Sequence, residues 1–337
     1  MVFDNLRRAL PGRLSVKHVF SCESDPKKRK WILDNFPSVT LLFGDVKELH
    51  TGMAMNYVTG KREPVPAVDI VVAGFVCKSV SIMNSQREQF QDCIRQAKGQ
   101  TGETFQGVVN YVKVFQPRIV ICENVRGLTY RNKGCEPLIN HVRSSFENMG
   151  YAFDSKVLDS RDYFLPHRRL RCWMWGFRGL ENKDIVKEVT NSVVSLASKQ
   201  FFDFRTLFRW AGVPHSARRK INQRERDVLD MARSRVEKKD RRLDMIVDIS
   251  KTVERAPYCF FAVPCLLPNS LLYRVDTGCI MTPEQMLCLQ GIYGADFPAL
   301  KKYAKTKGPL VRDLAGNAFS TPVCLAVLIS ILEHLPT

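Results

Sequence analysis

The hydrophobic and polar positions of the first 180 residues predict strands that alternate with helices. Nearly continuous apolar runs, typical of strands buried on both faces, occur at 67–73 (AVDIVVA) and 118–122 (RIVIC). Apolar residues at helical spacing occur at 105–115 and 138–149, where Gly150 ends the pattern. The other predicted elements are strands at 16–22, 39–43, 156–158 and 171–176 and a helix at 26–35. This alternation predicts an α/β fold with a Rossmann-like, doubly wound sheet of parallel strands.

The second half of the chain differs because it carries an excess of basic residues. Residues 205–242 contain 13 Lys or Arg against 5 Asp or Glu, a net charge of +8. We interpret this segment as a helical surface that follows phosphates, and a solvated helix with many ion pairs is the alternative. A compact pattern returns with a capped helix at 282–290 and a closing helix after Pro322.

Composition and charge narrow the class of protein. The 337 residues are 45% hydrophobic, enough for a large core, and the net charge of +17 indicates a polyanionic partner such as nucleic acid or an acidic membrane surface. The 11 cysteines include no C-x-x-C pair, which argues against a zinc site, and their odd number fits a reducing compartment. The start has no apolar signal region, and the longest apolar run, 323–332, is too short for a bilayer. We therefore expect a soluble intracellular protein with no metal site and no membrane contact.

Acidic side chains follow two early predicted strands. Glu23 comes directly after the first strand, and Asp45 follows the second after one glycine. Ligands of a doubly wound sheet bind beyond the carboxyl ends of its strands, so both acids are candidates for a nucleoside-containing ligand. Glu23 suits the two hydroxyls of a ribose, and Asp45 suits the exocyclic amine of an adenine. A helix cap or an ordinary loop residue is the alternative for each acid alone.

A thiol and a third carboxyl follow the two most apolar strands. A thiolate at Cys77 can add to an electron-poor ring carbon, while Glu123 can hold or protonate a ring nitrogen and make that carbon more electrophilic. A buried, inert cysteine is the alternative for Cys77, but Gly74 and the polar pair Lys78 and Ser79 indicate a loop.

These motifs, in this order, resemble the cytosine-5 DNA methyltransferase family. The stretches that carry the resemblance are AGFVCKSVS (73–81) at the nucleophile loop, ENVRGL (123–128), the basic strand motif YFLPHRRLRCWMWGF (163–177), TPEQMLCLQGI (282–292) and GNAFSTPV (316–323). Each stretch is short, but five in the family's order and spacing form a specific signal.

The resemblance implies a methyltransferase that uses S-adenosyl-L-methionine and acts on a cytosine flipped out of double-stranded DNA. It implies that Cys77 attacks C6 of the base while Glu123 contacts N3 and the exocyclic amine. Arg171 matches the arginine at the base carbonyl, and Arg169 is expected to support the same site. For the cofactor, the resemblance assigns Glu23 to the ribose, Asp45 to the adenine and Asn317 to the methionine end.

The resemblance also divides the chain into three regions. We expect a catalytic and cofactor-binding α/β domain at 1–178, a small basic target-recognition domain at 179–275, and a return to the catalytic domain at 276–337. The residues expected to contact nucleic acid are Lys78, Ser79, Arg218, Arg219 and Lys220.

The sequence departs from the family pattern in four places. The family opens with a glycine-rich loop that holds the cofactor. Too little chain precedes Glu23 to include this loop, so we expect an N-terminally truncated catalytic domain. Phe75-Val76 and Lys78 replace the usual Pro-Pro and Gln around the nucleophile. His167 stands in place of a glutamine, and Cys279 stands where an arginine is expected.

Three other functions remain open. The first is a catalytically inactive homologue that binds nucleic acid or a partner methyltransferase, which the truncated start favours. The second is an RNA cytosine-5 methyltransferase, which the basic segment permits, although the Cys-Phe-Thr run of such relatives is absent. The third is methylation of a small molecule, which the basic segment disfavours. We expect the protein in the nucleus if its source is eukaryotic and in the cytoplasm otherwise.

Overall fold

The computed structural model divides the chain into two compact units. Residues 7–158, 170–195 and 327–337 form what we call the α/β unit, and residues 1–6, 159–169 and 196–326 form the second unit. Residues 276–326, predicted to return to the catalytic domain, cluster with 196–275 in this division. The structure describes residues 2–12, 14–81, 84, 87–90, 92–131, 135–180, 182–198, 200, 202–213, 218–236, 245–294 and 297–335.

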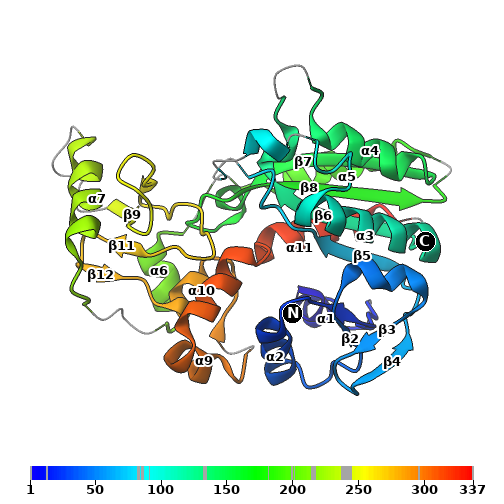
Figure 1. Cartoon of the computed structure of the whole chain (residues 1–337), viewed down its shortest axis with the longest axis horizontal. Helices are drawn as coiled ribbons and strands as arrows, with labels where there is room; N and C mark the ends of the chain where they lie inside the picture. The colour runs from blue at the N-terminus through cyan, green and yellow to red at the C-terminus, as the bar shows by residue number, and fades with distance from the viewer. Residues whose placement is uncertain are drawn as a thin grey trace. The chain divides into compact units, whose positions relative to one another are not determined.

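The α/β unit contains two sheets of four strands each (Figure 1). The first has the order β1-β2-β3-β4, with β1 parallel to β2 and the other pairs antiparallel. Its strands are β1 (Ser21–Cys22), β2 (Leu42–Phe43), β3 (Met53–Asn56) and β4 (Lys61–Pro64). The second sheet has the order β5-β6-β8-β7, with β5 parallel to β6. Its strands are β5 (Ile70–Gly74), β6 (Ile119–Val125), β7 (Tyr151–Asp159) and β8 (Leu170–Arg178).

The α/β fold predicted from the sequence is confirmed, but the predicted sheet of parallel strands differs from the structure in two respects. The strands form two sheets, and β8 runs antiparallel to β6, with Arg171 opposite Val125. The reason lies in the connection before β8, which contains the short 3-10 helix Ser160–Tyr163 and no α-helix among its residues 160–169. A crossover between parallel strands needs a dozen or more residues, usually with a helix, so this short connection returns the chain in the opposite direction.

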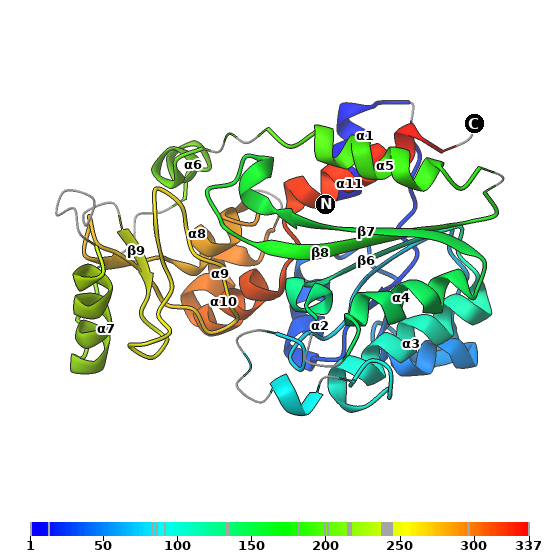
Figure 2. The ribbon, with the colours of Figure 1, turned by 90° about the horizontal axis from the view of Figure 1, so that it is seen from above.

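Helices cover both faces of the second sheet. Figure 2 shows α3 and α4 on one face, with α5 and the C-terminal half of α11 on the other. Ser192 of α5 donates a hydrogen bond to Glu333 of α11 at 3.1 Å. The helices are α2 (Pro26–Asn35), α3 (Gly99–Phe115), α4 (Leu138–Glu147), α5 (Ile185–Ser195) and α11 (Thr321–Glu333). The predicted helix at 26–35 is confirmed, because Asp25 caps it and proline suits its first position.

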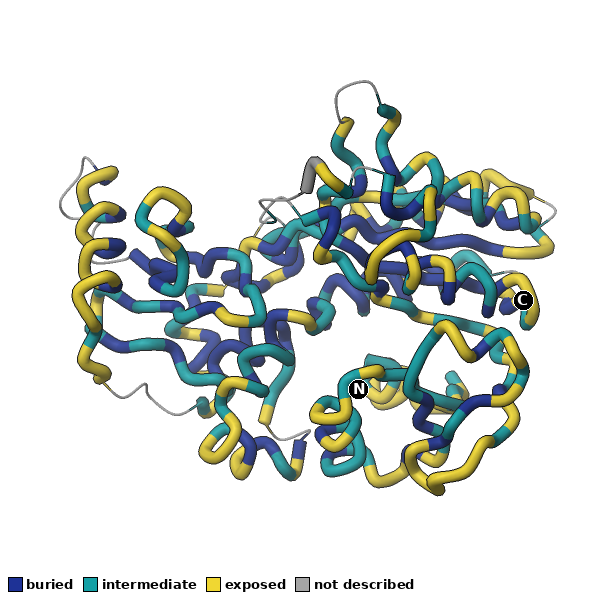
Figure 3. The backbone as a smooth tube through the Cα atoms, in the orientation of Figure 1, coloured by how far each residue is buried: buried dark blue, intermediate teal, exposed yellow. Residues whose placement is uncertain are grey.

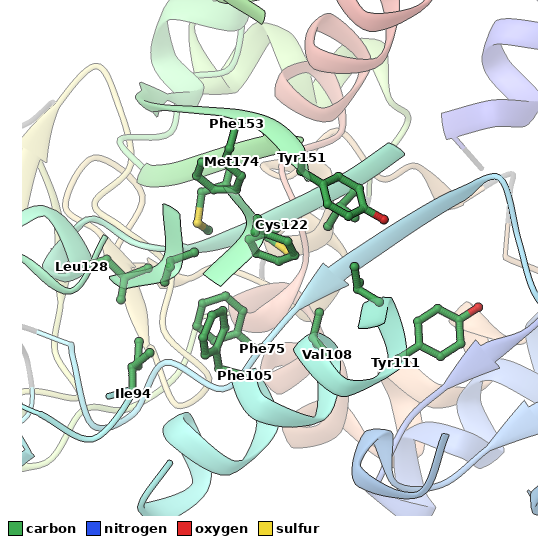
Figure 4. Packing of buried hydrophobic residues seen from close by; sticks show 14 of the residues in the cluster. Phe75, Ile94, Phe105, Val108, Tyr111, Cys122, Leu128, Tyr151, Phe153 and Met174 are labelled. Atoms are coloured by element: carbon green, nitrogen blue, oxygen red, sulfur yellow. The ribbon is translucent and has the colours of Figure 1, made fainter. Parts of the chain in front are cut away.

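One hydrophobic core serves both sheets of the α/β unit (Figure 4). Phe105 of α3 packs against Phe75 with ring centroids 5.2 Å apart. Tyr111 of the same helix packs against Phe20, which also contacts Phe43 of β2, both at 5.7 Å. Helix α3 therefore holds the ends of strands from both sheets in fixed positions.

The second unit combines a small antiparallel sheet with short helices. The sheet has the order β10-β9-β11-β12. Buried residues of α7, such as Val228 and Leu229, share a core with Met245 and Val247 of β9. The elements are α6 (Phe204–Trp210), α7 (Gln223–Ser234), β9 (Met245–Asp248), β10 (Tyr258–Phe260), β11 (Leu272–Arg274), β12 (Cys279–Ile280), α8 (Pro283–Cys288), α9 (Leu300–Thr306) and α10 (Gly308–Asn317). Thr282 and Gln285 form the predicted capping box at the start of α8.

Helices lie near both ends of the described chain. Helix α1 (Val2–Ala9) opens it, and α10 and α11 precede its end. The stretch Gly308–Glu333 is long and apolar enough to cross a membrane, but 61% of its most apolar window is buried inside the protein, as is usual for a core helix.

Candidate functional site

The loop that carries Cys77 begins where β5 ends. Gly74, the last residue of β5, lies opposite Glu123 of the parallel strand β6. The thiol and the carboxyl therefore come from the carboxyl ends of neighbouring strands, as the sequence predicted. Phe75 anchors the loop in the core, Cys77 is half-buried, and Lys78 is exposed.

Hydrogen bonds fix the backbone on both sides of Cys77. Asn124 Nδ2 donates to the Phe75 carbonyl at 2.9 Å, and the Val76 N–H donates to Thr104 Oγ1 at 3.1 Å. After the cysteine, the Ser79 N–H donates to Thr101 Oγ1 at 3.2 Å. A proline at position 76 has no N–H and cannot make the bond to Thr104. The loop thus holds its shape by hydrogen bonds where the family pattern uses prolines.

Gly127 allows a second segment to approach this loop closely. It lies in the 3-10 helix η3 (Arg126–Thr129) that follows β6. A Cβ atom at position 127 would lie 2.0 Å from the carbonyl oxygen of Val80, so only glycine fits there. The sequence motif included this glycine, but its contact with the loop, like those of Thr101 and Thr104, depends on the fold and has no local sequence signal.

Glu123 and Arg171 form a nearly buried ion pair. Their Oε1 and Nε atoms lie 3.2 Å apart, and the side chains are 10% and 12% exposed. The antiparallel register between β6 and β8 brings them together. Burial, followed by the negative charge of Glu123, raises the pKa of the adjacent Cys172 to about 12. This second cysteine therefore stays protonated at neutral pH and is a poor nucleophile.

Arg169, two residues before Arg171, bonds within the second unit. Its guanidinium donates to the carbonyls of Leu266 at 3.3 Å, Gly316 at 3.1 Å and Ala318 at 2.9 Å. The side chain is buried. The bonds to positions 316 and 318 flank Asn317, so Arg169 holds the segment that carries this candidate.

The neighbouring His167 is also a structural residue of the second unit. Its Nε2 accepts a hydrogen bond from the Leu266 N–H at 3.0 Å, and the residue is fully buried. Asn317 lies exposed at the end of α10, where its Nδ2 donates to the carbonyl and carboxylate of Asp313 at 2.9 and 3.0 Å.

Glu23 and Asp45 both cap local turns. Glu23 Oε1 accepts from the Asp25 N–H at 2.8 Å, and Asp45 Oδ1 accepts from the Lys47 N–H at 2.9 Å, at the start of the 3-10 helix η1 (Val46–Thr51). Asp45 is therefore the N-cap of η1, whereas Glu23 bonds to the loop residue that caps α2, and each carboxylate has a second oxygen.

A polar hollow of about 370 Å³ lies beside Asp45. Arg29 and Tyr57 also line it, and the Arg29 guanidinium lies 3.8 Å from the Tyr57 ring centroid. A carboxylate next to an aromatic ring fits the amine and the flat face of a nucleobase. Tyr57 was not predicted from the sequence, because it lies in no recognised motif and reaches Asp45 only through the turn between β3 and β4.

The residues expected to contact nucleic acid differ in exposure. Lys78 is exposed, whereas Ser79 is buried at 7% exposure. The basic cluster 218–220 is exposed, and one outer face of α7 is exposed as well (Figure 3). Arg219 pairs with the buried Glu225 at 2.5 Å. Burial alone would raise the pKa of Glu225, but bonds from the Asn222 backbone and Arg219 outweigh it and hold that pKa below its usual range.

The described residues contain no group of three or more His, Cys, Asp or Glu side chains that could hold a metal ion.

Comparison with known proteins gives a family match over most of the chain. The family model described as C-5 cytosine-specific DNA methylase matches residues 5–255. A DNA (cytosine-5-)-methyltransferase, DMT5, of Cryptococcus neoformans is 33% identical over 176 residues, which are 52% of this chain and 7% of that protein. The type II methyltransferase M.DsaV of Dactylococcopsis salina is 26% identical over 219 residues, 63% of this chain and 55% of the relative. The chain thus spans about half, or much less, of the length of these relatives.

Solved structures share the fold. The crystal structure of S. pombe Dnmt2 methyltransferase aligns with a TM-score of 0.56 at 11% identity. The alignment covers 98% of this chain and 94% of the Dnmt2 chain. A putative DNA modification methyltransferase encoded within a prophage of E. coli aligns with the same TM-score at 15% identity, over 94% of this chain and 92% of its own. At these identities the similarity supports the mixed α/β fold alone.

Proposed function

The chain belongs to the C-5 cytosine-specific DNA methylase family, and we propose that it methylates C5 of a cytosine flipped out of double-stranded DNA. The observation that carries the proposal is the Glu123–Arg171 pair at the end of β6, next to the β5 end from which the Cys77 loop leaves. A carboxylate, a guanidinium and a thiol in neighbouring positions suit the polar edge of cytosine and its C6 atom.

Each of these side chains has a defined role in the proposed reaction. The Cys77 thiolate forms a bond to C6, and Glu123 holds N3 and the exocyclic amine while electron density moves onto C5. Arg171 binds the base carbonyl and keeps Glu123 oriented. After C5 gains the methyl group, a base removes the C5 proton, the C6–S bond breaks, and the aromatic ring is restored.

The family uses S-adenosyl-L-methionine, which supplies the methyl group when bound. We propose that Asp45 and Tyr57 hold its nucleobase beside the polar hollow and that Glu23 accepts from its ribose, each carboxylate through the oxygen not used in its cap. The assignment of Asn317 to the methionine end rests on the family motif alone.

Exposed basic residues support a nucleic acid as the substrate. The cluster 218–220 and the exposed Lys78 offer charges to phosphates. Ser79 is proposed to position the loop through its backbone rather than to contact DNA directly, because its side chain is buried. We propose the nucleus as the place of action if the source is eukaryotic and the cytoplasm otherwise, since these compartments hold the DNA.

Trapping with a fluorinated base tests this function. The protein is incubated with S-adenosyl-L-methionine and duplex DNA that contains 5-fluorocytosine, because fluorine at C5 cannot leave as a proton and so preserves the adduct. We expect a complex stable in denaturing gels with wild type and with Cys135→Ser, a half-buried control cysteine, but none with Cys77→Ser. No adduct with DNA, or one that persists in Cys77→Ser, contradicts the proposal. An adduct with 5-fluorocytidine RNA alone would make RNA the substrate.

A further inference from the structure

Helix α9 carries a basic surface outside the segment 205–242 that the sequence marks as basic. Residues 297–312 contain five Lys or Arg and no Asp or Glu. The helix buries Leu300 and Tyr303, and it exposes, together with its C-cap, the four lysines Lys301, Lys302, Lys305 and Lys307. None of these four pairs with a carboxylate of the residues that the structure describes. Lys301 and Lys305 lie one helical turn apart, where like charges repel each other, so a bound anion would stabilise the helix.

Helix α10 connects this surface to the basic cluster 218–220. Helices α9 and α10 are neighbours in the second unit (Figure 1). Burial, followed by the positive charge of Arg219, lowers the pKa of Arg312 on α10. The effect of Arg219 means that the two guanidinium groups lie near each other. Two basic stretches that are far apart in the sequence therefore belong to one positive surface of the second unit.

An exposed aromatic side chain lies beside the start of α9. Trp210, the last residue of α6, is 72% exposed, and the exposed Arg209 precedes it. The indole meets the half-buried Tyr293 edge to face, with ring centroids 5.1 Å apart. The next residue, Gly294, lies against α9, because a Cβ atom there would be 3.7 Å from Leu300 Cδ2. Tyr293 thus holds the indole next to the lysines of α9 and leaves most of it open to solvent.

We propose that this surface of the second unit binds a single strand of nucleic acid, with a base stacked on Trp210 and the phosphates along the lysines of α9. Sites for single strands combine a positive surface with aromatic side chains on which bases stack. A duplex would use the lysines alone, because its bases are already stacked on one another. DNA and RNA strands share the chemistry that the surface offers. The inference does not depend on the proposed function, because it needs neither Cys77 nor the cofactor.

Tryptophan fluorescence gives a direct test of stacking. The other three tryptophans, Trp31, Trp173 and Trp175, are at most 5% exposed, so quenching by a bound strand reports on Trp210. The full chain is titrated with oligothymidine, with oligouridine and with an abasic strand, each of about 12 nucleotides. We expect saturable quenching by the first two strands and binding of the abasic strand that is about 10-fold weaker, because it has no bases to stack.

Substitutions of Trp210 test the same contact without relying on its fluorescence. Anisotropy of fluorescein-labelled oligothymidine should show binding about 10-fold weaker with Trp210→Ala. Trp210→Tyr should stay within about threefold of wild type, because a phenol ring also stacks on a base. Binding of a duplex of the same length should not change in Trp210→Ala. Cys77→Ser should bind the strand as tightly as wild type, so a failure of methylation leaves this result unaffected.

The contribution of the lysines is measured by the dependence of binding on salt. Replacing three of them by glutamine should reduce the slope of log K against log salt for oligothymidine by about two. The triple variant is Lys301→Gln, Lys302→Gln and Lys305→Gln. A matched control removes the same charge from exposed lysines of the α/β unit and should keep the wild-type slope: Lys113→Gln, Lys156→Gln and Lys183→Gln.

Four results would overturn the proposal. They are the absence of saturable quenching by either strand, equal affinity for the abasic strand, equal binding by Trp210→Ala, and equal slopes in the two triple variants. Quenching by phosphatidylserine vesicles without quenching by a strand also contradicts it, because the surface then binds a membrane. Binding of oligothymidine alone or of oligouridine alone supports the site and identifies the strand as DNA or RNA.

Discussion

The Glu123–Arg171 pair makes a quantitative prediction about stability. Replacing Arg171 by methionine retains most of the side-chain volume and leaves a carboxylate that is 10% exposed without its cation. Breaking a buried ion pair from one side costs about 3–5 kcal/mol. The variant can instead protonate this carboxylate. For a carboxyl of ordinary pKa near 4.3, protonation at pH 7 costs about 3.7 kcal/mol, so the expected loss of stability lies in the lower part of that range.

The stability of Arg171→Met should also depend on pH. Without the cation, the folded-state pKa of Glu123 lies above its unfolded value, so the neutral carboxyl favours the folded state. The stability deficit relative to wild type is therefore smaller at pH 4 than at pH 7. Deficits that are equal at pH 4 and pH 7 contradict this reasoning.

Urea unfolding followed by tryptophan fluorescence measures the loss of stability and its dependence on pH. Trp173 and Trp175 lie buried on β8 near Arg171, so their fluorescence reports loss of this sheet. The double variant Glu123→Gln with Arg171→Met should return to within about 1 kcal/mol of wild type, because no charge remains. The control Lys187→Ala breaks an exposed pair with Asp184 and should cost under about 0.5 kcal/mol. A wild-type unfolding midpoint in Arg171→Met would refute the importance of the pair.

Three further outcomes are expected. Gly127→Ala should lose about 1–3 kcal/mol of stability and most methyl transfer, because the added carbon displaces Val80 and the nucleophile loop, as calorimetry and a tritium-transfer assay would show. Alanine at all three positions of 218–220 should reduce the dependence of log K on log salt by about two, since one of the three arginine or lysine charges is already paired. Cys122 and Cys172, with pKa values raised to about 12 by burial, should resist alkylation at pH 8 until urea unfolds the chain, as read by mass spectrometry.

Each of these outcomes has a result against it. Unchanged stability and transfer in Gly127→Ala would mean that the loop tolerates the displacement. An unchanged salt dependence would place the DNA elsewhere. Alkylation of either buried cysteine in the native state would show that the sheet opens locally.

The sequence predicted the existence of β5 and β6 well because an apolar run is a local signal. Burial on both faces was predicted for both runs and is found in β6, whereas β5 lies at the edge of its sheet with Val72 38% exposed. Strand direction has no such signal. The segment 171–176 was recognised as a strand, but its antiparallel pairing follows from the short connection that precedes it.

The sequence predicted candidate site residues by type and motif, but it could not predict their contacts. Cys77, Glu123 and Arg171 could be assigned because each lies in a recognisable motif, and the structure pairs the last two. Arg169 lies in the same motif, yet it bonds to carbonyls almost 100 or more residues away, which no spacing rule reveals. The threonine bonds to the loop likewise arise only once α3 packs against β5.

The bonds of Arg169 have a consequence for the order in which the chain acquires its structure. Its acceptors on Leu266, Gly316 and Ala318 follow it by 97, 147 and 149 residues. A buried guanidinium without acceptors is costly, so the second unit cannot close around Arg169 before Ala318 is available. During synthesis, that moment comes only after residue 318 has left the ribosome. The second unit therefore completes its folding late, and a chain interrupted before residue 316 should be recognised by the cell as unfinished and degraded.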